Sequence, residues 1–291
     1  DAIMDQVLPG VIAAHNDGIF LTHERLKATL FLLIDTVKAG ARAVTAQLAA
    51  GSFTPLGSEV RFGEGQPFPP IALTLPEGGS ALLSGVIDRV DAAAAAGEDY
   101  IRIVDYKTGT RDFDLAGILH GLTLQLPIYL MAVTGRETGG KAAGLYYMPL
   151  RAAAPTGEEE AETLREAFRL RGLTLSDPAI LESSDSRMEG SSAVLHGVKH
   201  TEEGAYTGSV CTGDQLELLL AAAKAAAEKS LGRMLAGDIA ISPTERACGY
   251  CDYRSVCRFD PMRKGSHTRK YGKIKLDEFF SMIGGGDDLD G

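Results

Sequence analysis

Two aspartates and a lysine stand near the ends of two apolar segments of the sequence. Asp88 lies in the stretch GVIDRVD (85–91), and Asp105 and Lys107 lie in VDYKTG (104–109). Because Lys107 is two residues past Asp105, both side chains project from the same face of a strand. Paired carboxylates suit Mg²⁺ or Mn²⁺, which prefer hard oxygen ligands. A neighbouring lysine can orient an attacking water and stabilise developing phosphate charge, so the set fits metal-assisted phosphodiester hydrolysis.

A D-x-K pair alone would also fit a hairpin that ends in solvated charges. The segment QLPIY that follows makes the pattern more specific, because Gln125 and Tyr129 are four residues apart and share one face of a helix. Taken singly, these two side chains would be a buried amide and a core tyrosine. Glu59, on the strand before the motif, is interpreted as a structural acid that supports the site.

Three of the four cysteines lie close together in the sequence. Cys248, Cys251 and Cys257 form the pattern C-x2-C-x5-C, and Cys211 stands apart. A disulfide framework would spread its cysteines through a small secreted chain, whereas this spacing favours metal or cluster ligation in a reducing compartment. The spacing does not choose between zinc and an iron–sulfur cluster, so a zinc-ribbon interaction module is one alternative.

Composition sets wide limits on the protein class. The chain has 291 residues, 45% of them apolar and 23% charged, which is ordinary for a globular protein and excludes a disordered chain. No apolar run reaches the roughly 18–20 residues of a membrane helix, and no signal peptide is apparent, so we expect a cytoplasmic protein without membrane association. The chain does not begin with Met, and we expect it to be a domain of something larger.

The charge of the chain is segregated along the sequence. A net charge of −10 excludes a uniformly basic nucleic-acid binder, but a basic run extends from Arg254 to Lys275. This run predicts a DNA track, and its aromatic neighbours, Tyr253, Phe259 and Tyr271, would stack on unpaired bases. A solvated face that flanks the cysteines is the alternative. The cations assigned to DNA binding are Arg263, Lys264, Arg269 and Lys270.

Helices and strands alternate along the chain. Strands are predicted at Pro55–Phe62, Ala81–Asp91, Tyr100–Tyr106 and Ala143–Met148, with a long hairpin connection over Ala92–Asp99. Helices are predicted at Phe20–Ala50, Leu115–Val133, Glu158–Leu170 and Asp214–Leu235. The Ser- and Gly-rich stretch Ser183–Gly213 is interpreted as an insertion or a mobile loop. This order predicts an α/β fold with a central mixed sheet flanked by helices.

Together, Asp88, the D-x-K pair and the Q-x-x-x-Y helix resemble the RecB-like branch of the PD-(D/E)xK nuclease superfamily. The resemblance implies a restriction-endonuclease-like core. It implies that Asp88 and Asp105 are metal ligands, that Lys107 is catalytic, and that Gln125 and Tyr129 support the site or touch DNA. Such nucleases often have a metal-directed histidine on an early helix. The early candidates, His15 and His23, lack a convincing motif and are interpreted as surface residues.

The stretch from Ala247 to Asp260 is similar to the C-terminal iron–sulfur staple of AddB-type nucleases. That resemblance implies a 4Fe-4S cluster on Cys248, Cys251 and Cys257, an AddA-type helicase–nuclease subunit as partner, and single-stranded DNA ends as substrate. In that family the fourth cluster cysteine precedes the nuclease core. No cysteine precedes Cys211 here, so we interpret Cys211 as a non-ligand and expect an incomplete or absent cluster in this chain.

The expected activity is that of a metal-dependent DNA exonuclease or endonuclease in double-strand break repair and recombination. The alternative is a catalytically inactive module that binds DNA and stabilises a helicase–nuclease complex. The sequence has no G-x-x-x-x-G-K-[ST] loop, so we do not expect it to hydrolyse ATP. The predicted segments are a helical lead-in, a nuclease core, helices with the inserted loop, and a cysteine-rich staple with its tail, at residues 1–56, 57–150, 151–245 and 246–291.

Overall fold

The computed structural model describes residues 1–75, 78–109, 112–135, 139–150, 166–245 and 247–284. Contacts divide the chain into two compact units, each made of three stretches of sequence. The first is formed from residues 1–70, 84–113 and 129–216, and the second from residues 71–83, 114–128 and 217–291. The segment boundaries expected after residues 56, 150 and 245 stay predictions.

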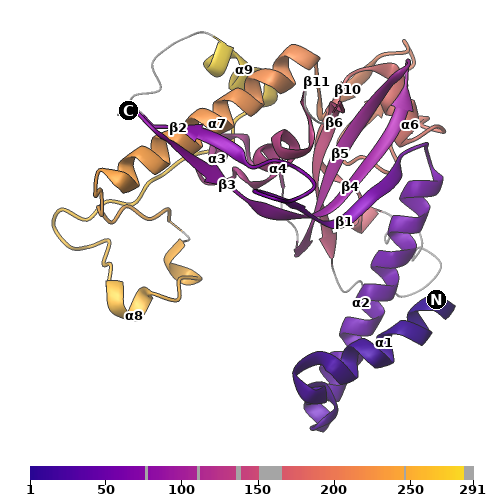
Figure 1. The fold of residues 1–291 in the computed structure, drawn as a ribbon, viewed down its shortest axis with the longest axis horizontal. Coiled ribbons are helices and arrows are strands. Elements are labelled where there is room, and N and C mark those ends of the chain that lie inside the picture. Colours follow the sequence, from indigo (N-terminus) through magenta and orange to yellow (C-terminus); the bar gives the residue numbers. More distant parts are fainter. Residues whose placement is uncertain (76–77, 110–111, 136–138, 151–165, 246, 285–291) are drawn as a thin grey trace. The chain divides into compact units, whose positions relative to one another are not determined.

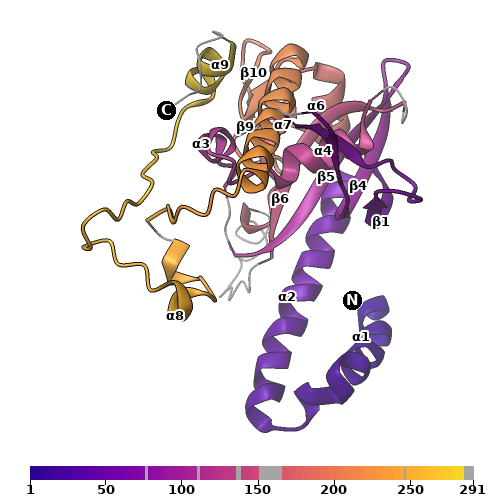
Figure 2. The same cartoon turned by 60° about the vertical axis from the view of Figure 1, so that its left-hand side comes forward.

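A helical hairpin begins the first unit (Figures 1 and 2). Helix α1 (Ala2–Ala14) is followed by the 3-10 helix η1 (His15–Leu21) and by α2 (Glu24–Ala49), which confirms the predicted long helix and adds α1. Ion pairs from Lys38 to Asp5 and from Arg42 to Asp1, at 2.5 and 3.0 Å, join the two long helices. None of the residues of α1 is buried.

A mixed sheet forms the body of the first unit, and among the described residues it has six strands in the order β1-β4-β5-β6-β7-β11 (Figure 1). β5 pairs with β6 and β7 pairs with β11 in parallel, and the other neighbours are antiparallel. Helix α2 and the short helix α6 (Pro178–Ser184) pack against it, so the predicted α/β fold with a flanked mixed sheet is confirmed. The strands are β1 (Thr54–Phe62), β4 (Gly85–Ala95), β5 (Glu98–Thr108), β6 (Lys141–Leu150), β7 (Arg171–Leu175) and β11 (Val210–Cys211).

The connection between β4 and β5 is shorter than the sequence indicates. The long loop predicted over Ala92–Asp99 is wrong, because both strands continue to a two-residue turn at Ala96 and Gly97. Their φ angles of 51° and 82° are both positive, as a type I′ hairpin turn requires. The alanines still alternate between the two faces of the strand, since Ala93 and Ala95 are buried while Ala94 is exposed, and this alternation lets the ladder continue.

Two predicted elements are divided in the structure. The strand expected at Ala81–Asp91 is broken at Ser84, because β3 (Ser80–Leu83) pairs with β2 (Ile71–Thr74) in a small sheet of the second unit. The helix expected at Leu115–Val133 is two helices, α3 (Leu115–Leu119) and α4 (Gln125–Val133). Gly121, whose φ is +68°, ends the first of them in the left-handed conformation that glycine tolerates best.

The stretch Ser183–Gly213 is not a loop without structure, which corrects the prediction. It contains three short paired strands, β8 (Gly190–Ser191), β9 (Val198–His200) and β10 (Tyr206–Gly208), and then β11. Buried Asp185 holds its start, accepting hydrogen bonds from Ser192 Oγ at 2.7 Å and from the Ala193 backbone N–H at 2.8 Å. Four apolar side chains of the stretch join the core beside α2: Met188, Val194, Leu195 and Val198.

Most of the regular structure of the second unit is helical. The long helix α7 (Gly213–Leu235) confirms the prediction for this region, and Gly237 follows it with a φ of +74°. The remaining elements are η2 (Ala247–Gly249), α8 (Arg254–Cys257) and α9 (Leu276–Gly284). The helix predicted at 158–170 falls mostly outside the described residues. Within the described part of the chain, no helix combines the length and apolar character needed to cross a membrane.

The tight contact between β6 and β7 gives a test of the sheet. A Cβ atom at Gly172 would lie 1.8 Å from the carbonyl oxygen of Leu145, so Gly172→Ala must displace the backbone. We expect a loss of about 1–3 kcal/mol in the free energy of unfolding, the usual penalty of overpacking. The matched control is Gly213→Ala, where a Cβ would meet no atom within 4 Å. Chemical denaturation measures both, and equal stability of the two variants would contradict the packing.

Candidate active site

The candidate catalytic acids lie where the β4–β5 ladder ends. The ladder runs from Ala95 opposite Glu98 to Arg89 opposite Val104, and one further step in that register places Asp88 opposite Asp105. Directly opposed residues of antiparallel strands share one face of the sheet. At this step the ladder changes, because the Tyr106 backbone N–H donates to Oδ2 of Asp88 at 2.8 Å.

This hydrogen bond fixes how near the two acids lie. The nitrogen of Tyr106 is bonded to the carbonyl carbon of Asp105. Standard bond lengths therefore put Oδ2 of Asp88 within about 5 Å of the Cα atom of Asp105. The structure thus brings together two aspartates that the sequence separates by 17 residues.

Lys107 completes the candidate site on the same face. Its Nζ lies 2.5 Å from Oδ2 of Asp105, and the Asp105 side chain is only 2% exposed. The ammonium also lies 5.6 Å from the ring centroid of Tyr147 on β6. A buried carboxylate is costly unless it is paired, so the Lys107 ion pair offsets the burial of Asp105.

The donor atoms of the site fit a hard divalent cation. Asp88 is half-buried and Asp105 is buried, and both offer carboxylate oxygens. Mg²⁺ is commonly held by one or two carboxylates together with water and substrate phosphates, so a larger set of protein ligands is not required. In the described residues, His, Cys, Asp and Glu form no group of three arranged to hold a metal.

The candidate residues Gln125 and Tyr129 both lie in α4. Gln125 is its first residue and belongs to the second unit, whereas Tyr129 belongs to the first, and both are half-buried. The ring of Tyr129 meets that of Phe62 edge-on, with centroids 6.0 Å apart. Tyr129 therefore supports the start of β4, because Gly85 lies against both rings. The catalytic roles of Gln125 and Tyr129 stay predictions.

The remaining acid and the histidines are on the surface. Glu59 is exposed on the edge strand β1 with a φ of +52°, an uncommon backbone conformation for a residue that is not glycine. His15 and His23 are exposed on the helical hairpin. Glu59 is one of the residues around a cavity of about 500 Å³ at the sheet edge, together with Leu56, Ser58, Val60, Arg61, Gln66, Pro67 and Phe68.

The cysteine cluster stays a prediction. Cys248 on η2 is half-buried, and Cys251 and Cys257 are exposed. Thiolates are suitable ligands for iron or zinc. Within the described residues, however, no three His, Cys, Asp or Glu side chains are arranged to hold a metal, so the three thiols are not gathered into a metal site in this structure. Cys211 is buried in β11, and this burial raises the pKa of its thiol to about 12.

The basic residues assigned to DNA binding differ in their surroundings. Arg263, Lys264 and Lys270 are exposed, and Lys270 pairs with Glu245 at 3.2 Å. Arg269 is half-buried and donates from Nε to the Ser242 carbonyl at 2.8 Å, so it helps to hold its own segment. Tyr271 has the same role, because its hydroxyl donates to Oδ2 of Asp114 at 3.2 Å and its ring lies 5.0 Å from that of His120.

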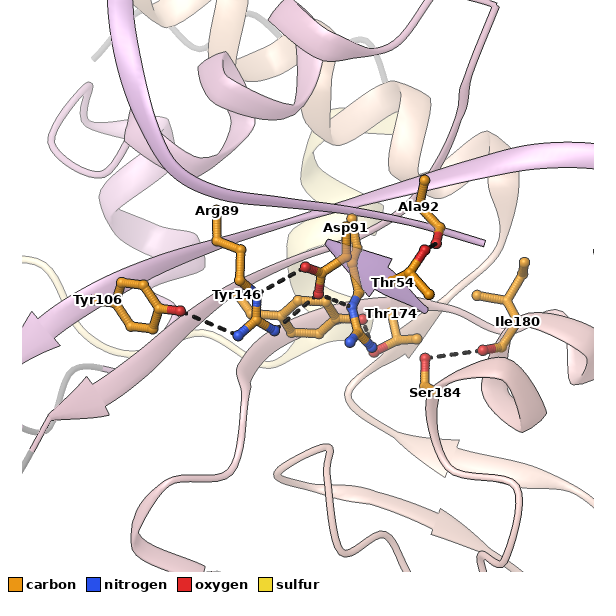
Figure 3. A network of polar contacts seen from close by, with 10 residues as sticks. Thr54, Arg89, Asp91, Ala92, Tyr106, Tyr146, Thr174, Ile180 and Ser184 are labelled. Atoms are coloured by element: carbon orange, nitrogen blue, oxygen red, sulfur yellow. Dashed lines mark hydrogen bonds and ion pairs between the residues drawn. The ribbon is translucent and has the colours of Figure 1, made fainter. Parts of the chain in front are cut away.

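Sequence reasoning missed a buried ion-pair network on the other face of the sheet (Figure 3). Oδ2 of Asp91 accepts from Nη2 of Arg89 and from Nε of Arg102, both at 2.9 Å. Arg89 Nε also lies 2.9 Å from Oδ1 of Asp91, and Arg89 Nη1 donates to the Tyr106 hydroxyl at 3.2 Å. The only signal in the sequence was the presence of charged residues within otherwise apolar strands.

The two arginines of this network differ in their electrostatics. Burial alone would lower the pKa of Arg89, but the nearby Asp91 and Tyr106 oxygens outweigh it and raise that pKa. For Arg102, which is 1% exposed, burial dominates and lowers the pKa despite Asp91. Arg102 also faces the positive charge of Arg89, which lowers its pKa further.

The described α/β fold, with its mixed six-stranded sheet, agrees with a family that the sequence matches. A family model described as the PD-(D/E)XK nuclease superfamily matches residues 1–258. The chain belongs to this superfamily, which confirms the expected restriction-endonuclease-like core.

Among curated proteins, the chain is similar to those named as the B subunits of the ATP-dependent helicase/deoxyribonuclease in several bacteria. It is 34% identical to that of Clostridium acetobutylicum over 291 residues, which cover 95% of this chain and 25% of the relative. It is 35% identical to that of Caldanaerobacter subterraneus subsp. tengcongensis over 302 residues, which cover 97% and 25%. The chain thus spans about a quarter of the length of these relatives.

The environments of the cysteines predict their reactivity. In the metal-free protein at pH 8, a thiol reagent should modify Cys251 and Cys257 rapidly, whereas Cys211 should stay unmodified until the protein is denatured. Thiolate is the reactive form, and a pKa of about 12 leaves only about one Cys211 thiol in ten thousand ionised. Mass spectrometry of timed labelling measures this. Equally fast labelling of Cys211 and Cys251 would show that β11 is not buried.

Proposed function

We propose that this chain is a Mg²⁺-dependent DNA nuclease domain that hydrolyses phosphodiester bonds in a single strand supplied by a helicase. The observation that carries the proposal is the junction of β4 and β5. There the carboxylate of Asp88 is held against the backbone beside buried Asp105, and Asp105 contacts Lys107. Membership of the PD-(D/E)XK superfamily supports the same chemistry.

Each side chain has a distinct role in this proposal. Asp88 and Asp105 would hold the cation, which supplies charge to stabilise the phosphate and to acidify a bound water. Asp105 also orients Lys107 through their ion pair. The Lys107 ammonium then positions a water for attack and stabilises charge on the phosphate oxygens in the transition state. Gln125 and Tyr129 are proposed to support the site or to contact DNA.

Likeness to named relatives supports the proposal of a larger assembly around this chain. By likeness to helicase/deoxyribonuclease B subunits, we propose a role in double-strand break repair beside an AddA-type subunit. ATP hydrolysis would then occur outside this chain, which has no phosphate-binding loop of the G-x-x-x-x-G-K-[ST] type. A 4Fe-4S cluster on Cys248, Cys251 and Cys257 in the intact protein is part of the same proposal.

Replacing one acid tests the catalytic assignment. Asp105→Ala should reduce Mg²⁺-dependent cleavage of single-stranded DNA by at least about 100-fold, since it removes a metal ligand and the partner of Lys107. Asp99→Ala, an exposed aspartate of the same strand, is the matched control and should keep parental activity. Comparable cleavage by Asp105→Ala and Asp99→Ala would refute the assignment. A parent that binds DNA but never cleaves it would support the inactive binding module.

The basic run can be tested by the salt dependence of DNA binding. Replacing the exposed cations Arg263, Lys264 and Lys270 by alanine should weaken single-strand binding. It should also reduce the slope of log affinity against log salt by about 2, because each lost phosphate contact removes about 0.7. Fluorescence anisotropy at several salt concentrations measures both quantities.

The control for this experiment replaces Arg187 and Lys199, exposed cations of the first unit, and should change neither quantity. Arg269 is left intact because its bond to Ser242 holds the segment, and its loss would confuse folding with binding. If the triple variant keeps the parental affinity and slope, the basic run is a solvated surface.

A further inference from the structure

The buried network of Arg89, Asp91 and Arg102 is difficult to explain by stability alone. It places two cations against one anion at positions that are at most 4% exposed. Within the described residues, Nη1 and Nη2 of Arg102 have no hydrogen-bond partner. The guanidinium lies 4.2 Å from the ring centroid of Phe53, which compensates it only in part. Substituting a buried ion pair by well-packed apolar residues often costs no stability. Stability alone therefore does not explain why these three charged residues are buried here.

The network fixes the register of the two strands that carry the candidate site. Asp91 lies opposite Arg102 in the β4–β5 ladder, and Arg89 lies opposite Val104, its last pair before Asp88. Because side chains alternate between faces, a slip of one residue would turn Asp91 away from Arg102 and Arg89 away from Tyr106. Such a slip would also move Asp88 away from the face that it shares with Asp105.

One residue connects the network to the site on the opposite face. The side chain of Tyr106 projects to the network face, where its hydroxyl accepts from Nη1 of Arg89 at 3.2 Å. The backbone N–H of the same residue donates to Oδ2 of Asp88 at 2.8 Å. The Tyr106 side chain is therefore held by Arg89 on one face of the sheet. Its backbone N–H holds the carboxylate of Asp88, which lies on the other face.

We propose that Arg89 and Tyr106 are positioning residues for the metal site. Anchored by Asp91, Arg89 holds the Tyr106 ring, and the fixed Tyr106 backbone sets the direction of the Asp88 carboxylate toward the cation. This inference rests on the proposed function, because it requires Asp88 and Asp105 to hold a metal. Neither residue needs to touch metal, water or DNA to act in this way.

The test is metal binding by the whole chain in the absence of DNA. Tyr106→Phe removes only the hydroxyl that Arg89 holds, and Arg89→Lys keeps the charge but loses the planar fork that reaches both Asp91 and Tyr106. We expect each to weaken Mn²⁺ binding in calorimetry by about 3- to 10-fold. This is at or below the usual range for residues that orient ligands, because the effect passes through the backbone.

A matched variant separates positioning from general loosening of the sheet. Tyr146→Phe also removes a hydroxyl on this face, one that bonds Thr174 Oγ1 at 2.8 Å (Figure 3). It should keep the parental Mn²⁺ affinity. Hydrogen exchange gives a second readout, since the Tyr106 amide should exchange faster in Tyr106→Phe and in Arg89→Lys than in Tyr146→Phe.

Asp105→Ala distinguishes failure of this inference from failure of the proposed function. If Asp105→Ala abolishes Mn²⁺ binding while Tyr106→Phe and Arg89→Lys bind and exchange as the parent does, the positioning role is overturned and the metal site stands. If Asp105→Ala binds Mn²⁺ as tightly as the parent, the metal site is wrong and the positioning role falls with it. Equal weakening in Tyr106→Phe and Tyr146→Phe would also overturn the proposal, since it would show a general effect of lost hydroxyls.

Discussion

A site of this kind depends on keeping two carboxylates adjacent at the point where two strands separate. Adjacent negative charges repel, and strands that diverge lose the ladder bonds that would hold them. In this protein the Asp88 side chain accepts the bond that a backbone carbonyl would otherwise take from Tyr106. The same contact therefore ends the ladder, satisfies a backbone donor and immobilises an acid. The ion pair of Lys107 with Asp105 balances the second charge.

The sequence located the two acids and the lysine that the structure brings together, but not the contacts that support them. Asp88, Asp105 and Lys107 could be found because their spacing relative to apolar strands is local information. Arg89, Asp91 and Arg102 could not, because alternation along a strand gives a charged residue the same pattern whether it meets solvent or a buried partner. Only the register, which the turn at Ala96 and Gly97 fixes, reveals that they meet.

The errors in the predicted fold have the same origin in contacts distant in sequence. Ser183–Gly213 has the composition of a loop, yet Asp185 organises its start and its apolar residues enter the core. The basic run shows the converse. Its composition predicted a DNA track that included Arg269 and Tyr271. In the structure Arg269 bonds to Ser242 and Tyr271 to Asp114, so both side chains hold their own segment. Composition describes a segment, but its partners decide what each residue does.

The short turn between β4 and β5 also has a consequence for the order of folding. It joins the three candidate catalytic side chains into one hairpin whose contacts are local in sequence, while β6 and the later strands add contacts over longer separations. Hairpins form within about 1–10 μs, and long-range pairings are slower because more chain entropy is lost. We therefore expect the two acids to come together before the sheet is complete. Rate measurements on variants of this hairpin and of β7 would show which contacts are present in the transition state.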